Sequence, residues 1–367
     1  MHSEFLFTAC QVGAEKVLKE EFLKIQPDFK FSFSRPGFVT FKNSKGTVPL
    51  DFKLQSVFAR VYGTSFGVMT AQDLTPFLKV IRSLREQDSR LRFRLQCWER
   101  DQHLPGDEPL GYQRGELLGG IEAQLIEFLK REEKSLDLER SGEPQDGECV
   151  LQVIAVDPGR FALGAYLQSA HHSPYPGGRI PLNLPQAAPS RAYLKLEEVI
   201  SWFHIPVRRG DLAVEVGSAP GGASFALLQR GLDVVGIDPG VMDAGVLAHP
   251  RFKHLATSVN RVPRESLPES IQWLLLDMNV DPSISLFAVD RLASRMKDTL
   301  LGVIFTVKMN DWKFAREIPH MIAHVEAMGM VRVKAAQLSL HRREIVIYGL
   351  SRKGKARWTT QSQQSRS

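Results

Sequence analysis

The C-terminal half of the sequence alternates helical patterns with short runs in which nearly every residue is apolar. Such runs are typical of strands buried on both faces, as in a parallel sheet covered by helices on either side. The last two runs lie close together in sequence, which predicts an antiparallel pair. Helices are predicted at residues 192–202 and 223–230, and strands at 213–216, 233–237, 273–276, 302–307, 331–334 and 344–348. We therefore expect residues 190–352 to form a Rossmann-like α/β domain.

The N-terminal half has a different pattern, in which apolar and polar residues alternate along half-buried strands. Two α+β units are expected there, over residues 1–60 and 61–170. The first has predicted strands at 5–10 and 38–41 and a helix at 14–24, and the second has strands at 91–98, 149–156 and 161–167 and a helix at 115–133. The pattern thus predicts a modular α+β region ahead of the α/β domain.

Two segments have no such periodicity. Residues 171–189 are rich in proline and glycine, which predicts a linker, and its paired histidines, His171 and His172, are expected at the surface. Residues 353–367 carry lysine and arginine among glutamine and serine, which predicts a basic, disordered tail.

Composition narrows the class of protein. Lys and Arg number 47 against 41 Asp and Glu, and the resulting pI near 9.2 favours an anionic partner. No apolar run approaches the roughly 18 residues of a membrane span, and the first residues do not have the pattern of a secretory signal, so we expect a cytoplasmic protein. The three cysteines are widely separated, and no His, Cys, Asp or Glu cluster has a metal-ligand spacing, so no metal is expected.

A glycine-rich loop follows the first predicted strand of the α/β domain. Residues 217–222 read Gly-Ser-Ala-Pro-Gly-Gly, so that a ligand can approach the backbone where the next helix begins. The spacing differs from that of the dinucleotide fingerprint. Asp238 ends the second strand, 21 residues after Gly217, where a carboxylate can accept hydrogen bonds from both hydroxyls of an adenosine ribose. This order of strand, loop, helix, strand and acid predicts an adenosyl-binding site.

The motifs of two classes of methylase are absent from the sequence, and their absence favours a hydroxyl as the acceptor of the methyl group. All three cysteines precede residue 190, which argues against a cysteine-dependent methylase of pyrimidine carbon. Residues 277–280 read Asp-Met-Asn-Val rather than the Asp/Asn-Pro-Pro-aromatic sequence common in methylases of base amino groups. Methyl transfer to a hydroxyl by in-line displacement needs a rigid geometry and a base.

Four charged residues are candidates for this chemistry. Lys308 follows a predicted strand and would act as the base if its pKa were lowered by burial or by a second cation, for which Lys195 is the candidate. Asp277, at the carboxyl end of its strand, would hold the ammonium, and Glu344 would open the last strand at the same edge. For any one of these residues taken alone, a surface salt bridge is the alternative.

These motifs together resemble a known family. Residues 190–198, 217–222, 276–278, 307–309 and 343–346 are similar to the FtsJ/RrmJ-type ribose 2′-O-methyltransferases, and within them to the RlmM (YgdE) type, which methylates a cytidine ribose of 23S rRNA. The resemblance implies the class I methyltransferase fold, S-adenosyl-L-methionine as cofactor, and a catalytic tetrad with Lys308 as proton acceptor. The implied tetrad is Lys195, Asp277, Lys308 and Glu344, and the implied cofactor contacts are Ser190, Gly217, Ala219, Pro220, Gly221, Gly222, Asp238 and Asp277.

The similarity in sequence is specific across residues 190–350 and extends weakly into the linker, and one departure from the family lies within it. The RlmM type has a further acidic cofactor contact after the third strand, where the nearest position in this chain is Ser258. Over residues 1–170 the order of elements is similar to a ferredoxin-like domain followed by a THUMP RNA-binding domain. Arg92, Arg94 and Arg100, beside two aromatic residues, suit a contact with RNA. The interpretation we favour is that these arginines lie on the solvated face of a strand whose other face is buried.

The leading hypothesis is therefore a methyltransferase that acts on a ribose of RNA, with 23S rRNA or a large-subunit precursor as partner. Neither a membrane nor an obligate protein partner is expected. Two alternatives remain open at this point: a non-catalytic rRNA-binding assembly factor that keeps the fold, and an O-methyltransferase of another RNA or of a small molecule.

Overall fold

The computed structural model describes residues 3–110, 112–133, 138–139, 142–278, 292 and 298–364. The chain divides into two compact units, which we call unit 1 (Met1–Arg179) and unit 2 (Ile180–Ser367). No helix in the described ranges is long and apolar enough to cross a bilayer.

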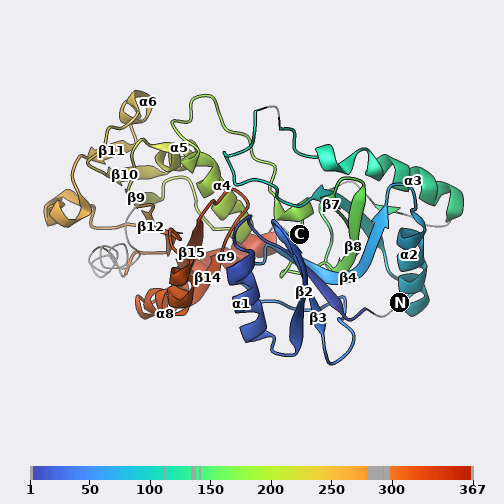
Figure 1. The fold of residues 1–367 in the computed structure, drawn as a ribbon. Coiled ribbons are helices and arrows are strands. Elements are labelled where there is room, and N and C mark those ends of the chain that lie inside the picture. The colour runs from blue at the N-terminus through green and yellow to red at the C-terminus, as the bar shows by residue number, and fades with distance from the viewer. Residues whose placement is uncertain are drawn as a thin grey trace. The chain divides into compact units, whose positions relative to one another are not determined.

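Unit 1 is built on one eight-stranded sheet in the order β2-β3-β1-β4-β8-β7-β5-β6. Most neighbouring strands are antiparallel, whereas β5 pairs in parallel with both β6 and β7. The strands are β1 (Phe5–Ala9), β2 (Phe29–Arg35), β3 (Phe38–Asn43), β4 (Val61–Thr70), β5 (Phe93–Glu99), β6 (Leu138–Glu139), β7 (Cys149–Asp157) and β8 (Arg160–Leu167). The helices of unit 1, which are labelled in Figure 1, are α1 (Glu15–Ile25), α2 (Thr75–Gln87) and α3 (Ile121–Glu132). The unit also contains the short 3₁₀ turns η1 (Glu116–Leu118) and η2 (Pro176–Gly178).

The sheet of unit 1 runs across the boundary that the sequence predicts at residue 60. Strand β1 is hydrogen-bonded to β3 on one side and to β4 on the other, so the ladder joins residues 1–60 to residues 61–170. Part of the predicted linker also belongs to this unit, because Gly177 and Gly178 are buried against Trp98 and Arg60. The names ferredoxin-like and THUMP for the two parts stay predictions.

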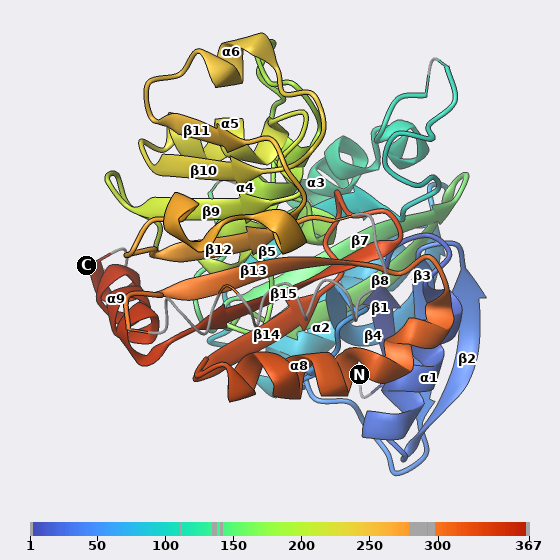
Figure 2. The ribbon, with the colours of Figure 1, turned by 90° about the vertical axis from the view of Figure 1, so that its left-hand side faces the viewer.

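Unit 2 contains the seven-stranded sheet β11-β10-β9-β12-β13-β15-β14, whose strands follow one another from top to bottom in Figure 2. The first five of these strands are parallel, and β15 is antiparallel to both β13 and β14, which confirms the predicted terminal pair. The strands are β9 (Leu212–Val216), β10 (Asp233–Ile237), β11 (Phe252–Leu255), β12 (Trp273–Leu276), β13 (Gly302–Lys308), β14 (Arg332–Ala336) and β15 (Glu344–Leu350).

Helices cover the sheet of unit 2 because their apolar residues join its core. Leu196, Val199 and Ile200 of one helix and Leu227 of the next pack with buried strand residues. The helices are α4 (Ala192–Phe203), α5 (Gly222–Gln229), α6 (Ala244–Leu247), α8 (Ile318–Ala327) and α9 (Arg352–Gln364), and the 3₁₀ turns are η3 (Val259–Arg261), η4 (Arg264–Ser266) and η5 (Trp312–Glu317). This sheet with its helices is the predicted Rossmann-like fold.

The prediction of a disordered tail is wrong for the residues described, because α9 is an ordered helix. Its Trp358 donates a hydrogen bond from Nε1 to the carbonyl oxygen of Phe203 at 3.1 Å, and the Arg332 guanidinium lies 3.9 Å from the centre of the Trp358 ring. Arg357 donates to a carboxylate oxygen of Asp211 at 2.6 Å. These contacts hold α9 in place, although the helix is mostly polar and has little apolar surface to bury. Residues 365–367 lie outside the described range.

Candidate active site

The four candidate catalytic residues come from four separate elements and meet at one edge of the sheet of unit 2. Lys195 lies on α4, Asp277 directly follows β12, Lys308 ends β13, and Glu344 opens β15. Lys308 and Glu344 are cross-strand partners in the antiparallel pair β13–β15. The carboxyl ends of the parallel strands therefore place these residues where open α/β sheets bind ligands.

The four side chains form a continuous chain of alternating charge, which we call the tetrad. Lys308 donates from Nζ to Asp277 Oδ1 at 2.7 Å and to Glu344 Oε2 at 2.6 Å. The other oxygen of Glu344, Oε1, is in contact with Lys195 Nζ. Two cations and two anions thus balance one another, and both carboxylates hold the Lys308 amine in a fixed place.

The pKa of Lys308 differs from the expectation drawn from the sequence, which was that burial or a second cation would lower it. Burial alone would lower the pKa of Lys308, but the charges of Asp277 and Glu344 outweigh burial and raise it above its ordinary value. Lys195 contacts Glu344 and so does not supply the expected lowering. Burial alone would raise the pKa of Glu344, whereas His341, Lys195 and Lys308 lower it to about 2. Lys308 is therefore an ammonium ion in the resting site.

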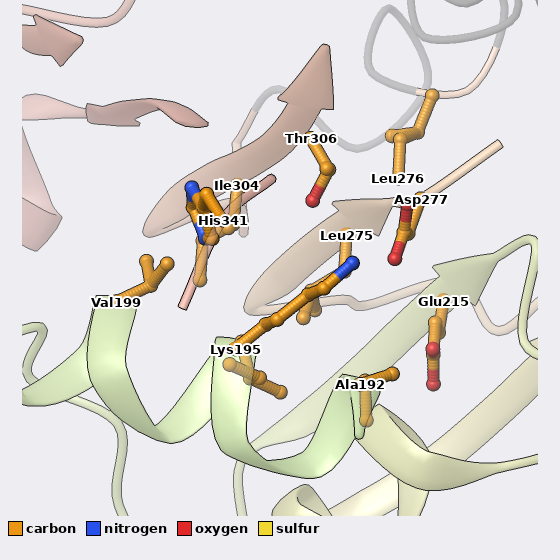
Figure 3. Close-up of a pocket in the computed structure, with 12 residues that line it drawn as sticks. Ala192, Lys195, Val199, Glu215, Leu275, Leu276, Asp277, Ile304, Thr306 and His341 are labelled. Atoms are coloured by element: carbon orange, nitrogen blue, oxygen red, sulfur yellow. The ribbon is translucent and has the colours of Figure 1, made fainter. Parts of the chain in front are cut away.

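A cavity that is open to solvent lies between α4 and the strand ends (Figure 3). In the view of Figure 3 the Lys195 amine reaches along the cavity toward Asp277, while His341 lies at the other end near Val199 and Ile304. The lining residues are Ala192, Lys195, Leu196, Val199, Glu215, Ala223, Leu275, Leu276, Asp277, Ile304, Thr306 and His341. Two members of the tetrad, Lys195 and Asp277, therefore border this cavity.

Three polar residues of this cavity, Glu215, Thr306 and His341, were not predicted as site residues from the sequence. Glu215 is buried and accepts a hydrogen bond from the Ser224 hydroxyl, and burial, with Asp277 and Asp238 adding to it, raises its pKa to about 8. His341 is also buried, burial lowers its pKa, and neither ring nitrogen has a hydrogen-bond partner within the described ranges. A carboxyl inside the apolar strand β9 is a signal that could have singled out Glu215, whereas no pattern in the sequence singles out His341.

The glycine loop joins β9 to α5 and fits closely against its neighbours. Gly217 has a φ of +84°, and a Cβ added there would lie 2.3 Å from the carbonyl oxygen of Asp277. A Cβ on Gly222 would lie 2.2 Å from Ser190 Oγ. Only glycine therefore lets the loop lie against both Ser190 and Asp277, which brings four predicted cofactor contacts together: Ser190, Gly217, Gly222 and Asp277.

The other predicted cofactor contacts lie at the same edge of the sheet. Asp238 follows β10 and accepts hydrogen bonds from the backbone N–H of Ala219 at 3.2 Å and of Gly240 at 2.7 Å, one on each carboxylate oxygen. Each oxygen keeps a second acceptor position, as two ribose hydroxyls would require. Ser258 is exposed and lies three residues beyond β11, next to β10 in the sheet. Residues 279 and 280, which the sequence analysis also used, lie outside the described range.

The arginines proposed as RNA contacts are mostly engaged inside unit 1. Arg94 is buried and donates to Glu148 at 2.9 Å, and Arg100 donates to the carbonyl oxygens of Val156 at 2.6 Å and Pro36 at 3.0 Å. The side chain of Arg92 is exposed. Arg94 and Arg100 therefore contribute to the packing of the sheet more than to an open surface.

Comparison with known proteins independently supports a methyltransferase. The family model for FtsJ-like methyltransferases matches residues 188–345. A protein from Alkalilimnicola ehrlichii named ribosomal RNA large subunit methyltransferase M is 29% identical over 249 residues, which cover 64% of this chain and 64% of that protein. A protein of the same name from Laribacter hongkongensis is 30% identical over 250 residues, which cover 64% of this chain and 67% of that protein.

The chain spans about two thirds of the length of these two curated relatives. The match to a solved structure of a possible methylase from Clostridium difficile 630 covers 95% of this chain and 98% of that chain, at 9% identity and with a TM-score of 0.32. By its sequence match to the Laribacter hongkongensis protein, the chain belongs to the family of ribosomal RNA large subunit methyltransferase M.

Proposed function

We propose that the chain transfers a methyl group from S-adenosyl-L-methionine to a ribose 2′-hydroxyl of RNA, and that the acceptor is a cytidine of 23S rRNA or of its precursor. Family membership supports the methyltransferase class and the ribosomal RNA substrate. The observation that carries the proposal is the tetrad, in which two carboxylates hold the Lys308 amine at the ligand-binding edge of the sheet.

The glycine loop and its neighbours fit the cofactor. S-Adenosyl-L-methionine supplies the electrophilic methyl group on a positively charged sulfur. Gly217, Ala219, Pro220, Gly221 and Gly222 would form the backbone cradle, with Ser190, Asp238, Ser258 and Asp277 around it. The free acceptor positions on Asp238 suit the adenosine ribose, and the missing side chains of the glycines leave room for close approach.

Lys308 would manage the proton of the acceptor hydroxyl. The amine would first lose one proton to solvent. It would then take the 2′-hydroxyl proton as the ribose oxygen forms its bond to the methyl carbon and the bond from that carbon to sulfur breaks. The cofactor would leave as the neutral thioether S-adenosyl-L-homocysteine, and Lys308 would again be an ammonium. Asp277 and Glu344 stabilise the positive charge that develops on Nζ during this step. The same two charges that raise the pKa of Lys308 therefore make it a stronger base, although a smaller fraction is neutral at a given pH.

The test uses the purified full chain, methyl-labelled S-adenosyl-L-methionine and 23S rRNA transcribed in vitro. We expect label to enter RNA and to be recovered as 2′-O-methylcytidine, and Lys308→Ala to lower the single-turnover rate by about 10²–10⁴-fold while cofactor affinity is kept. The matched control is Lys313→Ala, which removes an exposed lysine that is paired with Asp311.

Two outcomes would overturn the proposal in different ways. Label in a base or in a small molecule instead of a ribose would assign another acceptor. Cofactor binding and RNA binding with no methyl transfer on any rRNA substrate would favour a non-catalytic assembly factor.

A further inference from the structure

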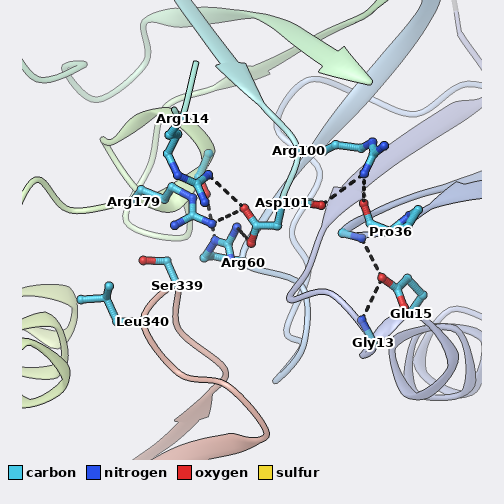
Figure 4. A network of polar contacts seen from close by, with 12 residues as sticks. Gly13, Glu15, Pro36, Arg60, Arg100, Asp101, Arg114, Arg179, Ser339 and Leu340 are labelled. Atoms are coloured by element: carbon cyan, nitrogen blue, oxygen red, sulfur yellow. Dashed lines mark hydrogen bonds and ion pairs between the residues drawn. The ribbon is translucent and has the colours of Figure 1, made fainter. Parts of the chain in front are cut away.

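A second cluster of charged side chains lies in unit 1 and has no part in the methyl-transfer step. We call it the Asp101 cluster; it consists of Asp101 and three arginines that contact its carboxylate (Figure 4). Asp101 Oδ2 accepts a hydrogen bond from Arg60 Nη2 at 2.8 Å. Asp101 Oδ1 is in contact with Arg179 and lies 3.5 Å from Arg114 Nη1. Three guanidinium groups therefore surround a single carboxylate.

The elements of unit 1 fix the cluster from four directions. Arg60 directly precedes β4, and Asp101 lies two residues beyond β5. Arg114 belongs to the segment between β5 and η1, and Arg179 directly follows η2. Arg60 also donates from Nε to the carbonyl oxygen of Gly177 at 2.8 Å, which ties the η2 segment to the sheet.

The charges of the Asp101 cluster do not balance. Three cations face one anion, which leaves an excess of two positive charges. The neighbouring carboxylate, Glu99, accepts hydrogen bonds from the Tyr112 hydroxyl at 2.8 Å and from the backbone N–H of Leu117 at 3.2 Å. Glu99 and the neighbouring Arg100 carry opposite charges, so including both of them leaves an excess of two positive charges.

Exposure increases from the inner members of the cluster to the outer ones. The side chains of Asp101 and Arg60 are each 1% exposed, that of Arg179 is 21% exposed and that of Arg114 is 35% exposed. Burial lowers the pKa of Arg114, and the nearby charge of Arg179 lowers it further, as expected for two cations held close together. The buried pair thus fixes two outer guanidiniums whose mutual repulsion an anion would relieve.

Two donors of the cluster also lack acceptors. Arg60 Nη1 and Arg179 Nε are buried and have no hydrogen-bond partner in the part of the chain that the structure describes. Buried donors are nearly always paired, so these two N–H groups leave hydrogen-bonding capacity unused within the described residues. Guanidinium forks match the geometry of phosphate oxygens and stay charged at any physiological pH.

From these observations we propose that Arg114 and Arg179, fixed by Arg60 and Asp101, form a binding site for one phosphodiester group of an RNA backbone. That the polyanion is RNA rests on the proposed function; that the site takes a phosphate rests on the cluster itself. Such a contact fixes the position of the RNA and reads no sequence.

The test measures binding of in vitro transcribed 23S rRNA to the full chain by filter retention between 50 and 300 mM KCl. The double variant Arg114→Gln/Arg179→Gln should raise Kd by about tenfold or more and lower the slope of log K against log salt by about one, as expected for the loss of one phosphate contact. The matched control is Arg90→Gln, which removes an exposed arginine paired with Asp88 and should change neither quantity. Wild-type Kd and salt slope in the double variant would overturn the proposal.

Two further arms separate the remaining explanations. Arg114→Lys keeps the charge and loses the fork, so it should fold as the wild type and bind RNA more weakly; if it binds RNA as tightly as the wild type, no fork is used and the proposal is wrong. Calorimetric titration with inorganic phosphate distinguishes the source of the anion, because phosphate binding that the double variant loses while RNA binding stays unchanged would assign the site to free phosphate. Methyl transfer by the wild type tests the proposed function separately from all of these results.

Discussion

The tetrad of unit 2 and the Asp101 cluster of unit 1 contain the same kinds of charge in different proportions. In the tetrad two lysines alternate with two carboxylates, and the charges cancel. In the Asp101 cluster three arginines share one carboxylate, and positive charge is left over. Both are held by the ends of strands and both are partly buried, so the difference lies in the balance of charge and in the identity of the cation.

That difference separates two kinds of function. A lysine can lose its proton, and two carboxylates around it stabilise the proton when it returns, so a balanced lysine cluster suits proton transfer. An arginine does not lose its proton in proteins, so an arginine cluster with excess charge suits the binding of a permanent anion. The comparison therefore supports proton transfer as the proposed role of the tetrad and RNA positioning as the proposed role of the Asp101 cluster.

The largest effect is expected when Lys308 of the tetrad is replaced by arginine, which is the cation of the Asp101 cluster. Lys308→Arg keeps a positive charge between Asp277 and Glu344 but cannot supply a neutral amine. We expect single-turnover methyl transfer to fall by about 10²–10⁴-fold, as for loss of a general base, with thermal stability near that of the wild type. A variant that keeps a tenth or more of the wild-type rate would show that Lys308 acts through its charge alone.

The second effect concerns the carboxylate that holds the Asp101 cluster. The charges of Arg60 and Arg179 outweigh burial and lower the pKa of Asp101 to about 2. Asp101→Asn would leave buried arginine without its counter-charge, and we expect the free energy of unfolding to fall by about 3–5 kcal/mol. Denaturant unfolding measures it, with Asp51→Asn at an exposed position as the control. A loss below about 1 kcal/mol would mean that solvent compensates the arginines.

A smaller effect is expected from pH on the stability of unit 1. It must be distinguished from the effect of pH on the rate of methyl transfer at the tetrad. His172, which the sequence analysis placed at the surface, is instead buried, and its ring stacks on Tyr166 with centroids 4.2 Å apart. Burial, and to a lesser degree His171, lowers the pKa of His172 to about 4. The unfolded chain takes up this proton at about pH 6.5 and the folded chain only near pH 4. Stability should therefore be lost as pH falls through this window, by about 3 kcal/mol in total.

The variant His172→Phe can keep the ring stacking and removes the titration. Denaturant unfolding at pH 4, 5, 6 and 7 should show a flatter pH dependence for this variant than for the wild type. His171→Gln, at the exposed neighbouring position, should keep the wild-type dependence. Equal pH dependence in His172→Phe and the wild type would contradict the buried, neutral state of His172.

Sequence patterns predicted unit 2 better than unit 1 for a physical reason. Wholly apolar strands such as β10 and β12 and the glycine loop are local signals, and the structure has both strands at the predicted residues, 233–237 and 273–276. The four tetrad residues could be named because each stands at the end of such a strand or on the adjoining helix. Their hydrogen bonds, and the raised pKa of Lys308, depend on distances between elements that no local pattern contains.

Unit 1 depends more on contacts between distant residues. The edge strand β2 and the long strand β4 went unpredicted, and the pairing of β1 with β4 removes the boundary expected at residue 60. Asp101 and Arg179 are 78 residues apart in sequence, so nothing in the sequence around either one points to the other. The same holds for α9, where Trp358 is anchored to Phe203.

The central claim is that a neutral Lys308 takes the hydroxyl proton, and the pH dependence of the chemical step tests it most directly. Because Asp277 and Glu344 raise the pKa of Lys308, only a small fraction of the amine is neutral near pH 7. The single-turnover rate of methyl transfer to 23S rRNA at saturating cofactor should therefore rise about tenfold per pH unit from pH 6 to pH 8. A rate that is constant across this range, in enzyme shown to stay folded, would contradict the account.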